Sequence, residues 1–112
     1  MNVSNPINLT DGQALELAET FRLLGDPSRL RILALCLGQP VCVSDIAERL
    51  ELSQSLVSHH LRLLRMARAV RAERHGRQMF YQAADDHIRC VIADMAAHLD
   101  ESIADDHAEQ AE

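Results

Sequence analysis

The sequence predicts a mainly α-helical domain that carries one β-hairpin. Apolar residues recur at helical spacing through most of the chain. A short helix, a tight turn and a second helix follow one another between residues 45 and 66. Two β-like runs then flank Gly76. A hairpin directly after a helix-turn-helix is a wing, so the predicted fold is a winged helix-turn-helix.

Length and composition support one soluble domain. The chain has 112 residues, of which 47% are hydrophobic and 25% are charged. No run approaches the roughly 18 to 20 apolar residues that cross a bilayer, and residues 1–6 lack the pattern of a signal peptide. We therefore expect a cytoplasmic protein without a membrane partner. Its three cysteines include no Cys-x-x-Cys pair, which disfavours a disulfide framework or a structural zinc ribbon.

The first half of the chain predicts a loose arm and two helices. Residues 1–10 show no periodicity and are expected to form a flexible arm. Residues 13–24 form the first predicted helix, which ends at Gly25. Asp26 is the expected N-cap of the second helix, with Pro27 at its first position. Gly38 and Pro40 end that helix.

The helix-turn-helix and the wing come next. Ser44 is the expected N-cap of a helix over residues 45–50, and Ser53 caps a fourth helix over residues 54–66. The predicted strands of the wing are residues 70–74 and 79–82. Gly76 suits a turn between them that needs a positive φ.

A long last helix and an acidic tail complete the chain. Asp85 is its expected N-cap, and the helix covers residue 86 to about residue 103. Residues 105–112 are acidic and expected to fray. The predicted organisation is thus a flexible arm (1–10), one winged helix-turn-helix domain (11–104) and an acidic tail (105–112).

The charge is distributed unevenly although the whole chain carries a net charge of −6. Residues 52–82 hold six arginines and one acid, whereas residues 83–112 hold one arginine and nine acids. A local basic segment is what contact with phosphates requires, whatever the global charge. Double-stranded DNA is therefore the expected partner.

The second helix of a helix-turn-helix enters the major groove with its N-terminal residues at the base edges. Arginines farther along the helix and on the wing suit phosphates or an adjacent minor groove. Of the two adjacent histidines, we expect His60 to face the core. The candidate DNA-binding residues are Gln54, Ser55, Ser58, His59, Arg62, Arg65, Arg74 and Arg77.

Four segments resemble the ArsR/SmtB family of bacterial winged-helix repressors. They are residues 24–33 (LGDPSRLRIL), 44–47 (SDIA), 52–61 (LSQSLVSHHL) and 76–81 (GRQMFY). The resemblance covers roughly residues 13–103. It implies a homodimer joined through its first and last helices, which binds an inverted-repeat operator and is released by an effector.

The last helix carries four candidate metal ligands: Asp85, His87, His98 and Glu101. His87 and His98 are about 16 Å apart along a helix axis but lie within about 20° of one face. One ion cannot reach both within a single helix, because zinc binds its ligands at about 2.0–2.2 Å. Two antiparallel helices resolve this, since Asp85 and His87 of one protomer then meet His98 and Glu101 of the other.

Two nitrogens and two carboxylates suit Zn(II), and the family resemblance also implies zinc, with Co(II) as a surrogate. The expected function is a repressor whose metal-free homodimer binds DNA and is released by zinc. Nickel or cobalt sensing is an alternative in which His107 adds a ligand. No catalytic motif appears and the metal set is closed, so we expect no enzyme.

A thiol- or persulfide-responsive repressor of the same fold is a further alternative, with Cys42 and Cys90 as its sensing pair. Many members of the family carry Cys-x-Cys at the start of the third helix. Here Ser44 replaces the second cysteine, so a soft-metal site is not expected there. Cys42 and Cys36 are then expected to be small buried apolar residues.

Overall fold

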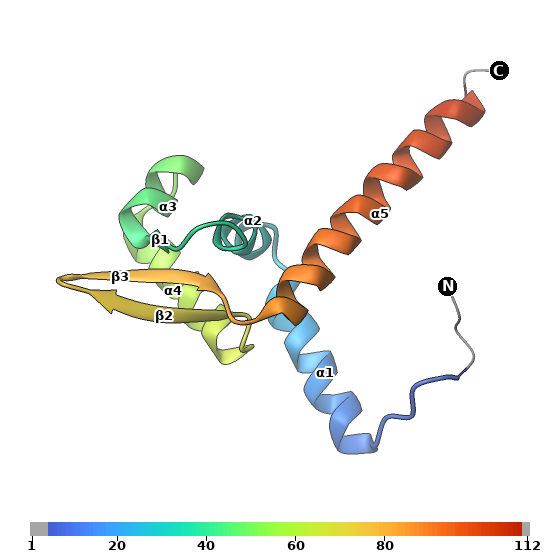
Figure 1. The fold of residues 1–112 in the computed structure, drawn as a ribbon, viewed down its shortest axis with the longest axis horizontal. Coiled ribbons are helices and arrows are strands. Elements are labelled where there is room, and N and C mark those ends of the chain that lie inside the picture. Colours follow the sequence, from blue (N-terminus) through green and yellow to red (C-terminus); the bar gives the residue numbers. More distant parts are fainter. Residues whose placement is uncertain (1–4, 111–112) are drawn as a thin grey trace.

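A computed structural model describes the backbone of residues 5–110 and the side chains of residues 5–101. Expectations for residues 1–4 of the arm, for residues 111–112 of the tail and for the side chain of His107 lie outside what the structure describes. The described chain forms a winged helix-turn-helix (Figure 1). Its elements are α1 (Asp11–Leu24), α2 (Pro27–Cys36), β1 (Val41–Cys42), α3 (Val43–Leu50), α4 (Gln54–Met66), β2 (Val70–His75), β3 (Gln78–Ala83) and α5 (Asp86–Gln110).

The wing is part of a three-stranded antiparallel sheet with the order β1-β3-β2. Strands β2 and β3 pair from Val70 opposite Ala83 to His75 opposite Gln78. Gly76 has a φ of 65° in the connecting turn, which confirms the reason for expecting glycine there. The two-residue strand β1 was not predicted. It pairs with β3 at Val41 and Tyr81, and so fixes the wing to the start of α3.

Most predicted caps are present. Asp26, Ser53 and Asp85 each accept a hydrogen bond from a backbone N–H three residues later. The prediction that Ser44 caps the third helix is wrong. Because β1 holds the chain extended through Cys42, α3 begins directly at Val43, with Cys42 in the N-cap position and no side-chain cap.

The two terminal helices also differ from their predicted bounds. α1 begins at Asp11 rather than residue 13, because the side chains of Thr10 and Gln13 each accept a hydrogen bond from the other residue's backbone N–H. α5 continues to Gln110, well past the expected end near residue 103. No helix in the described part of the chain is long and apolar enough to cross a membrane.

The core lies between α2, α3, α4 and the base of the hairpin. Its largest fully buried side chains are Ile32, Leu33, Ile46, Leu61 and Leu64. Burying one such side chain contributes roughly 1.5–3 kcal/mol before the cost in conformational entropy. Cys36 and Cys42 are also buried, as expected. The core therefore fixes α4 against α2 and α3 and leaves its opposite face to solvent.

α1 and α5 lie at the periphery of this core, and most of α5 projects away from it (Figure 1). Ile88 and Ile92 at the start of α5 pack against the core. The large apolar side chains that remain exposed on these two helices are Leu15, Leu17, Phe21, Val91, Met95 and Leu99. This is a large apolar surface for a protein of 112 residues.

Candidate functional site

α4 presents its polar residues to solvent along one face. Val57, His60, Leu61 and Leu64 are buried, which fixes the rotation of the helix about its axis. The opposite face exposes every α4 residue predicted to contact DNA, namely Gln54, Ser55, Ser58, His59, Arg62 and Arg65. The burial of His60 confirms the expectation that it is the histidine facing the core.

The wing lies beside this exposed face. Ser58, Arg62 and Arg65 of α4 line one shallow groove together with Tyr81 of β3. A second groove of about 430 Å³ brings Gln54 and Ser58 to Arg77 at the turn of the wing. Arg74 is exposed on β2. The structure thus places α4 and the wing on one basic surface, which suits the polyanionic backbone of DNA.

Some residues of this surface were not singled out from the sequence. Tyr81 lines both grooves, and Ser44, Gln78 and Met79 line the second. In the sequence, Tyr81 and Met79 belong to a β-like run and to the family-like segment 76–81, and neither is a predicted DNA contact. Their position beside α4 follows from the pairing of β1 with β3, which a two-residue strand does not reveal in the sequence. Tyr81 adds an aromatic side chain to the groove that Arg62 and Ser58 line.

His60 is held on the inner side of α4 by Arg29 of α2. The Nε–H of Arg29 donates to Nδ1 of His60 at 3.3 Å, across 31 residues of sequence. Burial lowers the pKa of His60, and the positive charges of Arg29 and His59 lower it further, while Asp26 opposes the shift. The neutral imidazole is therefore the form that fits this site.

The candidate metal ligands lie along α5. Asp85 caps the helix, with its Oδ1 accepting from the N–H of Ile88 at 3.0 Å. His87, His98 and Glu101 are exposed. Asp86 instead pairs with Arg89 at 3.0 Å, and Arg89 also donates to the carbonyl of Leu37. Of the two adjacent aspartates, Asp86 is thus engaged with a cation, whereas Asp85 keeps its Oδ2 for another ligand.

Within the described part of one chain, no three histidine, cysteine or acidic side chains converge on a point where a metal ion would fit. His87, His98 and Glu101 take part in no hydrogen bond or ion pair between described residues. Imidazole and carboxylate donors on an exposed helix remain chemically suited to zinc. Assembly of the predicted site from these residues requires a second chain.

The cysteines occupy three different environments. Burial raises the pKa of Cys36 to about 12, so its thiol is not ionised near neutral pH. Cys42 is buried, with its Sγ 3.2 Å from Oγ of Ser44. Cys90 is exposed on α5.

The fold and the basic surface define a winged helix-turn-helix DNA-binding regulator. Residues 26–72 match the model of the family described as bacterial regulatory protein, arsR family. The chain is 44% identical over 90 residues to the transcriptional repressor SmtB homolog of Synechocystis sp., covering 80% of this chain and 68% of that protein.

Two solved structures share this fold. The antimony-specific transcriptional repressor AntR has a TM-score of 0.75 at 26% identity, over 91% of this chain and 93% of that chain. A homodimeric winged helix-turn-helix domain of Mycobacterium bovis, Mb0332, also has a TM-score of 0.75, at 24% identity over 86% of this chain and 92% of that chain. The protein belongs to the ArsR/SmtB family of transcriptional repressors, and it is a DNA-binding regulator rather than an enzyme.

Proposed function

We propose that this protein is a zinc-responsive repressor. Its metal-free homodimer binds an inverted-repeat operator through α4 and the wing. Zinc binds at two equivalent sites between the subunits, each built from Asp85 and His87 of one chain with His98 and Glu101 of the partner subunit, and the operator is released. The observation that carries the proposal is the exposure of His87 and His98 on a helix that projects away from the core.

The pattern on α5 supports pairing of two such helices. Val91, Met95 and Leu99 are four residues apart and form one exposed apolar stripe. At about 100° per residue, His87 and His98 lie about 20–40° from Val91 on the helix surface. Antiparallel contact along the stripe therefore brings the histidines close to the seam. Pairing position 87 with position 98 puts the two-fold axis beside residues 92 and 93, within the apolar stripe.

The apolar surface of α1 also supports dimerisation. Leu15 is 74% exposed and Phe21 is 58% exposed, although both are large apolar side chains. Covering such residues in a symmetric contact is the usual solution for a small domain. Two α4 helices related by the same axis can then read two half-sites about 34–36 Å apart.

The donor set favours zinc. Each shared site offers two imidazole nitrogens and two carboxylates, which satisfies a tetrahedral ion without a further ligand. Nickel or cobalt would favour more ligands, and His107 is the predicted additional one. Zinc holds the two α5 helices in one relative orientation, and this moves the α4 helices out of register with the operator. Because coupling between two binding sites is reciprocal, DNA must weaken zinc binding by the same factor by which zinc weakens DNA binding.

The test is fluorescence anisotropy of a labelled duplex from upstream of the protein's own gene. Reduced, metal-free protein is titrated onto the duplex, zinc is added, and a chelator follows. The proposal predicts tight binding, release by stoichiometric zinc and recovery with chelator. Release by nickel but not by zinc would contradict the choice of metal. Indifference to metals with loss of binding on mild oxidation would favour Cys42 and Cys90 instead.

Matched variants separate the site from its surroundings. Glu101→Gln removes a proposed ligand charge, whereas Asp100→Asn makes the same change at the adjacent exposed position. The first variant should bind the duplex normally but require more zinc for release, and the second should behave like the unmodified protein. An equal shift in both variants would indicate a general charge effect and contradict the ligand assignment.

A further inference from the structure

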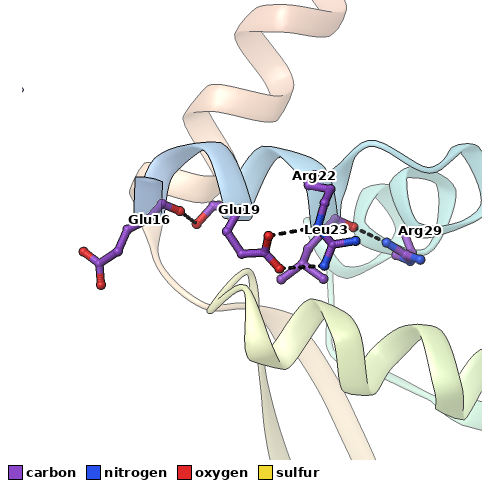
Figure 2. A network of polar contacts seen from close by, with 6 residues as sticks. Glu16, Glu19, Arg22, Leu23 and Arg29 are labelled. Carbon is purple, nitrogen blue, oxygen red and sulfur yellow. Dashed lines mark hydrogen bonds and ion pairs between the residues drawn. The ribbon is translucent and has the colours of Figure 1, made fainter. Parts of the chain in front are cut away.

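Arg29 connects three parts of the DNA-binding domain through one half-buried side chain. Its guanidinium donates to the carbonyl of Leu23 near the end of α1 at 2.7 Å, a contact that Figure 2 shows. It also donates to Nδ1 of His60 in α4 at 3.3 Å. Its backbone N–H donates to the carboxylate of Asp26, the cap of α2. Arg29 therefore joins α1 to the inner side of α4.

His60 is the only buried polar or charged side chain among the described residues, with 8% of its surface exposed. Because Nδ1 accepts from Arg29, the ring proton of the neutral form lies on Nε2. The charged or titratable groups that act on this ring are Asp26 beside α2, Arg29 within α2 and His59 in α4. Burial and the two cationic neighbours favour the neutral ring, and Asp26 opposes them.

We propose that Arg29 and His60 form a positioning pair that holds α4 in its DNA-reading orientation, and that protonation of His60 releases the pair and weakens operator binding without any metal. This inference rests on the proposed use of α4 as the reading helix. It makes acidification a second input to the repressor, separate from α5.

The chemistry of the contact gives the direction of the effect. A protonated His60 carries an N–H at Nδ1, so it can no longer accept from Arg29. Two cations then face each other in a partly buried site, with only Asp26 as a counter-charge. The link between α1 and α4 is lost in each protomer. Since α1 carries part of the proposed dimer contact, the loss alters the placement of both α4 helices relative to the two-fold axis.

Simple electrostatics predicts the opposite sign. Acidification makes the whole protein, which carries a net charge of −6 at pH 7, less negative and so strengthens its attraction to the DNA phosphates. If no positioning pair existed, binding would become tighter as the pH falls. Weaker binding at low pH therefore reports on a buried group such as His60 rather than on the general gain of positive charge.

The test compares pH profiles of duplex binding by anisotropy, with chelator present and at constant ionic strength, from about pH 7.5 to about pH 5.0. The range extends well below the ordinary pKa of histidine because burial lowers the pKa of His60. His60→Asn keeps an acceptor near the Nδ1 position but does not titrate. The affinity of the unmodified protein should fall about tenfold more than that of His60→Asn over this range, each relative to its own value at the higher pH. His59→Asn should retain the fall, because it leaves the contact between Arg29 and His60 in place.

A second pair of variants covers the case in which His60→Asn does not fold. Arg29→Lys keeps the charge but replaces the planar guanidinium, which reaches Leu23 and His60 through two different nitrogens, with a single ammonium nitrogen. Arg31→Lys makes the same change at an exposed position of α2. Arg29→Lys should bind the duplex more weakly near pH 7.5 and show a flatter pH profile. Arg31→Lys should match the unmodified protein in both respects.

The outcomes separate this inference from the proposed function. Parallel profiles for the unmodified protein and His60→Asn, with binding intact, would overturn the positioning pair and leave zinc release untouched. Divergent profiles in a protein that zinc does not release would support the pair and refute the zinc proposal. If the unmodified protein binds no duplex at any pH, both are overturned.

Discussion

Replacing Arg62 with alanine should lower affinity for every DNA sequence and reduce its dependence on salt. Arg62 is exposed on α4 and lines the groove that Ser58 and Tyr81 share. Each phosphate contact contributes about 0.9 to the slope of log affinity against log salt concentration. The two copies in a homodimer should therefore reduce that slope by about 1.8.

This change in slope can be expressed as an affinity ratio. Between 50 mM and 200 mM salt, a slope difference of about 1.8 changes the ratio of wild-type to variant affinity by about twelvefold, with the larger ratio at low salt. The assay is anisotropy on operator and random duplexes at several salt concentrations. Arg22→Gln is the control, because Arg22 pairs with Glu19 on α1 (Figure 2) and lines neither groove between α4 and the wing. An unchanged slope for Arg62→Ala would refute the assignment of Arg62 to a phosphate.

Three further predictions concern the reading helix and the core. Gln54→Ala should relax base preference, because glutamine can bind adenine through two hydrogen bonds. Competition with base-substituted duplexes measures this preference. Equal losses of affinity for operator and random duplex would show that Gln54 does not read a base. Leu64→Ala should lower the free energy of unfolding in urea by about 2–5 kcal/mol, since Leu64 is fully buried. Leu56→Ala is its control, because that side chain is 40% exposed and should cost much less. The hydrogen bond from the backbone N–H of Arg29 lowers the pKa of the Asp26 carboxyl below its ordinary 3.8. The stability that this carboxylate contributes is therefore present above pH 3.8 and is lost as the pH falls through its folded-state pKa. Asp26→Asn should flatten this acid limb of stability measured by urea unfolding, and an unchanged limb would contradict the cause.

The sequence was sufficient for elements whose boundaries depend on local chemistry. Asp26, Ser53 and Asp85 cap helices because a side-chain oxygen meets an orphan N–H three residues later, which is a local event. Gly76 marks its turn for an equally local reason. The exposed face of α4 follows from the spacing of its apolar residues alone.

Contacts between distant segments were not predictable in the same way. Strand β1 has two residues and shows no alternation, so the sequence gives no signal for its pairing with β3. That pairing moves the start of α3 to Val43 and places Tyr81 beside α4. The contact of Arg29 with His60 spans 31 residues and leaves no periodic trace. The proposed metal site is also a contact between distant segments, because its ligands come from two chains.

Sharing of the zinc site between protomers is the central claim, and mixed dimers test it directly. Zinc affinity is measured by competition with a chromophoric chelator for His87→Ala, for His98→Ala and for the two variants unfolded together and refolded as a mixture. Each variant alone should lack tight sites. A mixed dimer regains one intact site, because one chain supplies His87 and the partner supplies His98. Tight binding that appears only in the mixture is the predicted result, and a mixture that binds no better than the separate variants would contradict a site shared between subunits.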